Sequence, residues 1–460
     1  MSASDTGTTS LGLVVAANFT AEPVDDALGF WLEALRVSVR LRHAPFDQVF
    51  QQLLDPNSLL RGNRDGIGLV LVRLQSWFEQ DSAAEASRAS NPDRIIDEFV
   101  AAVREALRGA SSQLLVCFCP AIGLEGERLD MVARAERAVE EALRGEGGVR
   151  VLTSASVLEQ YPCPAIADAQ GERLAGIPYT PRFFSVLGTA LARGIYALTF
   201  PPHKVLVLDC DDTLWGGLCG ELGPLGVTLN EEHLALQRFA AEQRRDGKLI
   251  CLASRNREAD VFAVFDQNPA MALTRDDLTA WQINWGLKSD SLAELAAKLG
   301  LGLDSFVFLD DDPVQCAEVR RRFPEVLAIP FPGGDAAGFC RHIWPLDPRS
   351  STEEGSRRTG SYREHVARED IRASSQSFQQ FLDSLELEVD IAPLGEADLA
   401  RASELTYRTN QFNLTGRRVN EAEFRTRVLH EATPCFGVRV CDRFGDYGLV
   451  GLVLGERDGT

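Results

Sequence analysis

The sequence lacks several features that mark special classes of protein. No apolar run approaches the roughly 20 residues needed to cross a bilayer, and the opening MSASDTGTTSLGLVVAANFT has no basic stretch before a long apolar core, so it does not predict a secretory signal. Basic residues are few: 47 Lys and Arg against 67 Asp and Glu give a formal net charge of −20. A general nucleic-acid binder needs a basic surface to neutralise phosphates. We therefore expect neither a membrane nor a nucleic acid as a partner.

Zinc-binding and disulfide patterns are also missing. The ten cysteines form no CxxC pair, and the six histidines are scattered without zinc spacing. Several cysteines lie inside apolar runs, such as Cys251 in LICLAS, where a thiol behaves as a small hydrophobic group. This usage predicts free thiols in a reducing cytoplasm.

The length and the hydrophobic pattern predict three domains. The chain has 460 residues, 45% of them apolar and 25% charged, and a domain takes roughly 150 residues. Residues 1–200 alternate strand-like and helical segments, which indicates an α/β domain, and residues 201–345 repeat this pattern more regularly. Residues 346–365 are polar and have the composition of a linker. Residues 366–460 show an α+β pattern ending in GLVGLVLGERDG, a strand with nothing after it to pair with, so we expect an incomplete domain.

A pair of acids follows the first strand of the second domain. In VLVLDCDDTLWGG the apolar run ends in Asp209, with Asp211 and Thr213 just beyond. Ligands of an open parallel sheet bind beyond the carboxyl ends of its strands. One carboxylate can attack phosphorus while its neighbour moves the proton, and Mg²⁺ between them would relieve their repulsion. Taken alone, the pair is equally typical of a helix cap or a solvated turn.

Further polar residues follow in a set order. Ser254 ends the strand LICLAS, where its hydroxyl can hold a phosphate oxygen, and Lys288 in INWGLKSDS can balance negative charge. Asp310 and Asp311 end the strand FVFLDDDP as further metal ligands. Each residue is commonplace by itself, but this order at strand ends is hard to obtain by accident.

The ordered set resembles the four motifs of the haloacid-dehalogenase (HAD) superfamily, which implies a three-layer, Rossmann-like parallel sheet. By that resemblance Asp209 is the nucleophile, Asp211 the acid/base and Lys288 the charge-balancing lysine. Two further sets are assigned: the Mg²⁺ ligands are Asp209, Asp211, Asp310 and Asp311, and the phosphate- or substrate-binding residues are Ser254, Arg255, Asn256 and Thr213.

A narrower resemblance extends over most of the chain. DCDDTLWGGLCGE, AWQINWGLKS, LGLGLDSFVFLDDDP, TYRTNQFNLTGRR, DRFGDYGLVG and IPYTPRFFSVLGTALARGIYAL are similar to segments of the FkbH-like subfamily, from polyketide and mixed peptide–polyketide biosynthesis. The resemblance implies a glyceryl transferase and phosphatase. Such an enzyme takes the glyceryl unit of 1,3-bisphosphoglycerate, releases phosphate and loads an acyl carrier protein as a thioester. It also implies an SGNH-like domain before the HAD domain and a GNAT-like region after it.

Three positions depart from that subfamily; one of them is Asp312, often asparagine in its members, a neutral change. Its members commonly read Ser-Lys-Asn where this chain has Ser254-Arg255-Asn256, a change that keeps the charge. Gly176 stands where members have a histidine before IPYTP, so we expect no ester hydrolysis that depends on that histidine.

Two cysteines are candidates to carry the acyl group. Cys210 lies between the two acids, but strand alternation predicts that its side chain turns away from them. Cys219 lies in the glycine-rich stretch WGGLCGE after the first motif. The choice stays open, as does the interpretation that both only pack.

Other residues have weaker functional interpretations. Arg417 and Arg418 in TNQFNLTGRRV either contact a carrier protein or belong to a solvated turn. Trp215, Trp281 and Trp285 flank the motifs, and we expect them to pack rather than line a pocket.

Glyceryl transfer is therefore the leading hypothesis. The alternatives are a plain Mg²⁺-dependent phosphatase acting on a small phosphorylated metabolite, and a carrier-docking module with a vestigial site.

Overall fold

The computed structural model describes residues 10–84, 92–108, 112–347, 377–408, 418–429 and 434–455, and seven positions between 362 and 372. Two compact units emerge, one of Met1–Pro202 with Arg341–Ser350 and the other of His203–Cys340 with Ser351–Thr460. Most of the predicted linker, and Arg417, lie outside the described residues. None of the described helices combines the length and apolar character that crossing a membrane requires.

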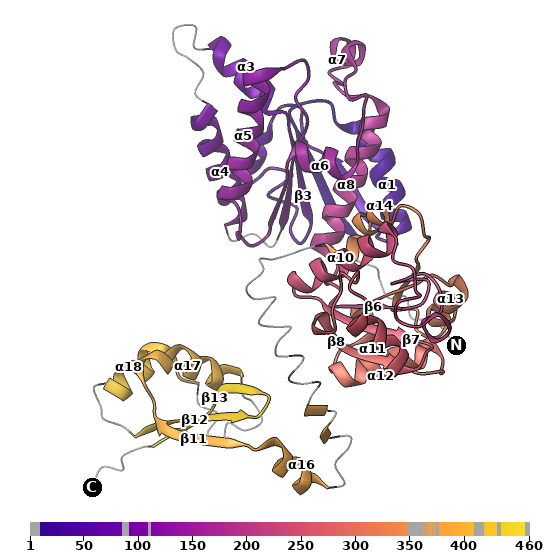
Figure 1. Cartoon of the computed structure of the whole chain (residues 1–460). Helices are drawn as coiled ribbons and strands as arrows, with labels where there is room; N and C mark the ends of the chain where they lie inside the picture. Colours follow the sequence, from indigo (N-terminus) through magenta and orange to yellow (C-terminus); the bar gives the residue numbers. More distant parts are fainter. Residues whose placement is uncertain are drawn as a thin grey trace, which may run out of the picture. The chain divides into compact units, whose positions relative to one another are not determined.

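The first unit is built on a five-stranded parallel sheet (Figure 1). Its strands lie in the order β2-β1-β3-β4-β5, which are Val39–His43, Leu11–Ala17, Ile67–Val72, Gln113–Phe118 and Val149–Leu152. The central strand β3 is buried along its whole length, as a parallel sheet with helices on both faces requires. Its apolar run therefore shows no alternation with polar residues.

Helices cover both faces of this sheet. One apolar cluster joins the sheet to α1 and α8, and the other joins it to α4 and α5, which lie on the opposite side (Figure 1). The helices of the unit are η1 (Glu22–Val24), α1 (Asp25–Ala34), α2 (Val49–Leu54), α3 (Leu74–Ala84), α4 (Pro92–Leu107), α5 (Gly126–Ala142), α6 (Ser154–Gln160), α7 (Ala169–Ala175), α8 (Pro181–Thr199) and η4 (Trp344–Leu346).

The second unit begins with another five-stranded parallel sheet. The order is β10-β9-β6-β7-β8, which are Leu327–Pro330, Phe306–Asp310, Val205–Leu208, Leu249–Ser254 and Leu278–Ile283. The central strand β6 is completely buried, so both of its faces are covered. The predicted α/β class with parallel sheets is confirmed.

Helices on this second sheet follow its strands closely. They are α9 (Cys219–Leu222), α10 (Glu231–Arg245), α11 (Glu258–Gln267), η2 (Arg275–Asp277), α12 (Lys288–Leu299), η3 (Leu303–Ser305), α13 (Pro313–Arg322) and α14 (Ala336–Arg341). Only three residues separate β7 from α11, and the connection from β6 to α10 contains only the one-turn helix α9. Neither connection, both of which the structure describes throughout, inserts a domain over the carboxyl edge of the sheet.

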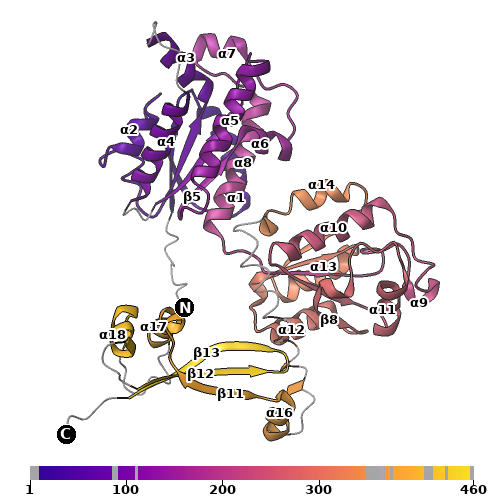
Figure 2. The same ribbon diagram turned by 60° about the vertical axis from the view of Figure 1, so that its left-hand side comes forward.

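The last part of the chain forms a three-stranded antiparallel sheet. Its order is β11-β12-β13, which are Glu388–Pro393, Cys435–Asp442 and Gly445–Leu454. Helices α17 (Leu399–Arg408) and α18 (Glu421–Leu429) lie together on one side of this sheet (Figure 2). Helix α16 (Phe378–Leu385) and η5 (Glu396–Asp398) complete the region. The final strand, for which the sequence offered no following partner, pairs backwards with β12 in a hairpin.

Candidate active site

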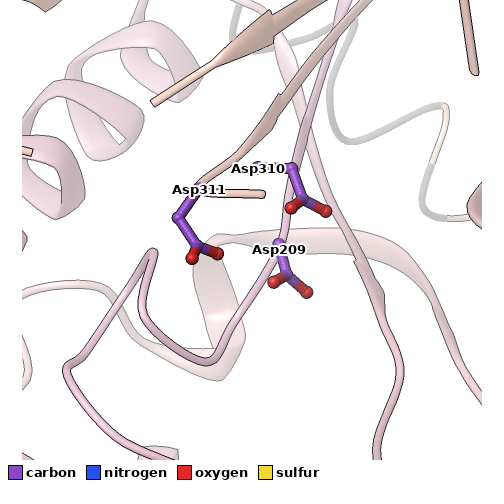
Figure 3. A group of neighbouring side chains, drawn as sticks. All are labelled: Asp209, Asp310 and Asp311. Carbon is purple, nitrogen blue, oxygen red and sulfur yellow. The ribbon is translucent and has the colours of Figure 1, made fainter. Parts of the chain in front are cut away.

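Three carboxylates converge where β6 and β9 end side by side. Asp209 follows β6, Asp310 ends β9 and Asp311 comes next, and the Asp209 N–H donates to the carbonyl of Leu309 at 3.0 Å. Each side chain offers one oxygen, and these oxygens lie within 4.8 Å of one another (Figure 3). Residues about a hundred positions apart meet because parallel neighbours end at the same edge.

Lys288 joins two of these acids. Its Nζ atom lies 2.5 Å from Oδ1 of Asp209 and 3.0 Å from Oδ2 of Asp310, and it donates to the carbonyl of Ala253 at 2.7 Å. The lysine is only 3% exposed. Burial lowers its pKa, but attraction to the two carboxylates outweighs burial and raises the pKa above its usual value. Lys288 is therefore a buried ammonium ion.

The three carboxylates outnumber the single ammonium of Lys288 that balances their charge. Burial raises the pKa of Asp209 to about 6, assisted by Asp310 and opposed by Lys288. The pKa values of Asp310 and Asp311 are also raised, again mainly by burial. Oδ2 of Asp310 is buried, and Nζ of Lys288 lies 3.0 Å from it. Three carboxylates balanced by only one ammonium fit a hard divalent cation, which prefers oxygen ligands.

Asp211 lies outside this carboxylate group, unlike its expected role as a metal ligand. Its Oδ1 accepts from Nε1 of Trp215 at 2.8 Å and from the N–H of Cys219 at 3.1 Å, and its Oδ2 accepts from Nδ2 of Asn256 at 2.7 Å. Both oxygens are thus already engaged by the protein. The arrangement suits a carboxylate held in place to move a proton.

The four residues expected to bind phosphate differ in burial and in their hydrogen-bond partners. Ser254 is 3% exposed at the end of β7, next to the carbonyl that Lys288 contacts. Asn256 contacts Asp211, whereas Arg255 is exposed and pairs with no described residue. Thr213 is completely buried: it donates to Asp311 at 3.2 Å and accepts the Asp311 N–H at 3.0 Å. Thr213 therefore orients Asp311. The sequence had predicted only phosphate or substrate binding for Thr213.

Both candidate cysteines are buried beside residues of the site. Cys210 is completely buried, and burial raises its pKa well above the usual value. The backbone N–H of Cys219 donates to Asp211, and burial and this carboxylate raise the pKa of the Cys219 thiol to about 12. Each is a neutral thiol that needs a base to become a nucleophile.

Of the three tryptophans, Trp215 packs and also serves the site. It is fully buried against Phe265, and its indole N–H reaches Asp211. Trp281 packs edge-on against Phe262, as expected, whereas Trp285 is 66% exposed. In the sequence, only the four-residue spacing between Asp211 and Trp215 pointed to this hydrogen bond. A tryptophan at this spacing is equally typical of a residue that only packs.

Comparisons with known proteins add one informative likeness. No family model matches the chain, and no curated protein matches it. Among solved structures, it is similar to the crystal structure of the N-terminal part of the protein BF1531 from Bacteroides fragilis, which contains a phosphatase domain and is complexed with Mg. The TM-score is 0.63 at 18% sequence identity, over 75% of this chain and 95% of that chain. This likeness shows the fold.

Proposed function

We propose that this chain is a Mg²⁺-dependent HAD-type enzyme acting on a phosphorylated small molecule. The observation that carries the proposal is the convergence of Asp209, Asp310 and Asp311 around the ammonium of Lys288. The Mg²⁺ in the structurally similar phosphatase domain supports the choice of metal. The test is phosphate release from a panel of phosphorylated metabolites, with Mg²⁺ and with chelator.

The residues would divide the work of phosphate removal. Asp209 attacks phosphorus, and Lys288 balances the charge of the nucleophile and the phosphate. Mg²⁺, held by Asp209, Asp310 and Asp311, supplies further neutralisation of the phosphate's charge. Asp211 donates a proton to the leaving oxygen and later takes one from water. Ser254 and the exposed Arg255 bind the phosphate oxygens.

We further propose that the substrate is 1,3-bisphosphoglycerate and that the glyceryl unit passes to an acyl carrier protein. A cysteine sulfur attacks the acyl carbonyl, the bond between the carbonyl carbon and the phosphate oxygen breaks, and the 1-phosphate leaves. The 3-phosphate is removed in a separate step by attack of Asp209 on its phosphorus and hydrolysis by water, so that a glyceryl thioester remains. The carrier's phosphopantetheine thiol then attacks the enzyme thioester and releases the cysteine. Motif resemblance supports this scheme.

The contacts give each cysteine a different part in that scheme. Asp211 accepts from the backbone N–H of Cys219 at 3.1 Å and is proposed to take the thiol proton during attack, whereas Cys210 is completely buried beside Asp209. Incubation with 1,3-bisphosphoglycerate and Mg²⁺, followed by intact-protein mass spectrometry, tests both. A glyceryl adduct lost in Cys219→Ala or in Cys210→Ala identifies the carrier of the acyl group. Cys251→Ala, in the same sheet, is the matched control.

A plain phosphatase is the second candidate. The neutral state of both thiols favours it, because phosphate removal by Asp209 needs no thiolate. Free phosphate without an adduct on enzyme or carrier would support it. Neither phosphate nor adduct, with Mg²⁺ bound, would support a docking module with a vestigial site.

The remaining assignments follow from the same resemblance. We propose an SGNH-like domain over residues 1–200, a HAD domain over 201–345, a linker over 346–365 and a GNAT-like region over 366–460. Arg418 lies over the ring of Tyr407 at 5.8 Å and is proposed to contact the carrier. The ten cysteines, all of them in the described part of the chain, have free thiols. We propose a cytoplasmic location from the cysteine usage of the sequence.

A further inference from the structure

The second unit contains a cavity at the carboxyl end of α12, far along that helix from Lys288. Its volume is about 570 Å³, within the roughly 300–1,000 Å³ of small-molecule sites. Three parts of the chain form its walls. Leu299 belongs to the end of α12, Tyr362 and Glu364 belong to the helical residues described between 362 and 372, and Asp446 and Tyr447 begin β13.

The walls of the cavity are joined to one another by the protein itself. The side chain of Asp442 is fully buried, and it accepts from Nε and Nη2 of Arg368 at 2.7 and 3.2 Å. It also accepts from the hydroxyl of Tyr447 at 2.7 Å. On the other side, Val366 is buried in the same apolar cluster as Leu299. The helical residues therefore contact both α12 and the hairpin, and the cavity between them is formed before any ligand binds.

The charges of the lining favour a cation. Among the described residues that line the cavity, Arg368 is the only basic one, and its two hydrogen bonds to Asp442 neutralise it. Glu364 and Asp446 add two further carboxylates against that single guanidinium. The carboxyl end of α12 adds the partial negative charge of a helix dipole. An anion would be repelled, whereas a cation would be attracted.

The size of the cavity and the number of its acids distinguish an organic cation from a metal ion. Hard divalent cations take about six to eight oxygen ligands, and the cavity offers only the carboxylates of Glu364 and Asp446. In the part of the chain that the structure describes, three acidic side chains close enough to share an ion occur only around Asp209. A single ion would also leave most of the 570 Å³ unfilled.

The remaining lining suits an apolar body attached to the cation. Tyr362 packs partly against the apolar cluster that contains Leu299. Tyr447 is 40% exposed, and the guanidinium of Arg368 already lies over its ring, 4.4 Å from the centroid. Tyrosine rings attract organic cations and pack well against flat apolar groups.

We propose that this cavity binds a small organic ammonium ion with an apolar or aromatic body. The ammonium donates to the carboxylates of Glu364 and Asp446, which together offer more acceptor positions than their protein partners use. The body lies against Tyr362 and Tyr447. This site is separate from the carboxylates around Asp209 and does not depend on the chemistry proposed there.

Three probes with the same phenylethyl body test the proposal: phenethylammonium, 3-phenylpropionate and 3-phenylpropionamide. The full chain, with ¹³C-labelled tyrosine, is titrated at neutral pH, and Tyr362→Phe and Tyr447→Phe assign the two signals among the six tyrosines. Phenethylammonium should shift one or both signals saturably and bind at least about tenfold more tightly than either other probe, a difference of ~1.4 kcal/mol. Equal or tighter binding of the anion or the amide, or no saturable shift with phenethylammonium, would overturn the proposal.

Two double variants separate the charge of the cavity from the net charge of the protein. Glu364→Gln/Asp446→Asn keeps the shapes of both side chains, including the oxygen of residue 446 that accepts from the Gly448 N–H at 2.7 Å. It should weaken phenethylammonium binding at least about tenfold. Glu369→Gln/Asp390→Asn is the matched control, because it removes two negative charges of the same unit from residues outside the lining, and it should bind within about twofold of the wild type. Both variants should retain the wild-type melting temperature within a few degrees. Equal weakening in the two folded variants would contradict the assigned cavity.

Discussion

Lys288 and Asp209 are 79 residues apart in sequence, yet Nζ and Oδ1 lie 2.5 Å apart in a nearly dry environment. The lysine is also 3.0 Å from Asp310, so a single ammonium connects the ends of two adjacent strands. Without this lysine, the two buried carboxylates would repel each other and would lack a compensating charge. The loss of the lysine is therefore costly. The pair holds the site together as well as balancing its charge.

Loss of Lys288 should strongly reduce turnover, but the protein should still fold when Mg²⁺ is present. Lys288→Ala removes the ammonium that balances nucleophile and phosphate, and we expect phosphate release to fall by about 10²–10³. Lys298→Ala, on the same helix α12, is the matched control and should keep turnover within about twofold. A Lys288→Ala enzyme with near-normal phosphate release would contradict the proposed site.

Asp310 should be required for metal binding. Mg²⁺ that binds only the folded state raises the melting temperature, and Asp310→Asn removes the charge of one of the three carboxylates that would hold the ion. We expect the Mg²⁺-induced thermal shift to be largely lost in this variant. Asp312→Asn changes a carboxylate two residues away that caps α13, and it should keep the shift. Differential scanning fluorimetry with and without Mg²⁺ compares the two.

Trp215 should act as a positioning residue for Asp211. Trp215→Phe keeps most of the ring packing but removes the hydrogen bond to Oδ1. We expect kcat to fall by about 3- to 30-fold, with little change in KM, because a misplaced acid/base affects the chemical step. The pH profile of kcat should also change. Trp281→Phe, which packs without contacting Asp211, is the control; an equal loss in both variants would indicate packing alone.

Glu136 should make the first unit more stable at mildly acidic pH. The residue is 1% exposed, and burial raises its pKa to about 7, although Ser154 hydrogen bonds oppose the shift. Between the usual glutamate pKa of 4.5 and about 7 the folded state binds more protons than the unfolded state, so stability falls as pH rises through this window. The full contribution is on the order of 3 kcal/mol.

Glu136→Gln removes this proton linkage. The free energy of unfolding, measured by denaturant titration from pH 4.5 to 8, should therefore depend less on pH in the variant than in the wild type. Glu140 lies on the same helix α5, and Glu140→Gln is the control variant. It should show the same pH dependence as the wild type. Parallel curves for wild type and Glu136→Gln would show that the acid is not the source of the linkage.

A buried ion pair should make residues 341–347 necessary to the stability of the first unit. Nε and Nη2 of Arg193 contact Asp347 at 2.7 and 2.5 Å, and Nη2 also donates to the carbonyl of Arg341. Asp347→Ala leaves the arginine buried without its partner, which typically costs about 3–5 kcal/mol. The double variant Arg193→Met/Asp347→Leu should recover much of this loss. Equal destabilisation in the single and double variants would contradict this account.

From the sequence alone, the buried strands β6, β7 and β9 could be predicted, together with the polar residues at their ends. Fully apolar runs such as VLVL and LICLA indicate a buried parallel sheet when helical segments alternate with them. Because parallel strands end at one edge, Asp209 and Asp310 were expected at the same edge of the sheet. The sheet order, which puts β9 directly beside β6, was not predicted.

Only the tertiary structure decided how the polar residues divide the site among themselves. Thr213 contacts Asp311, and Asn256 and Trp215 contact Asp211. These are hydrogen bonds between loops, and their geometry depends on strand order and on backbone turns that no sequence periodicity encodes. Periodicity places a residue on a face of a strand, whereas a loop side chain takes its partner from whichever group the fold brings within about 3 Å.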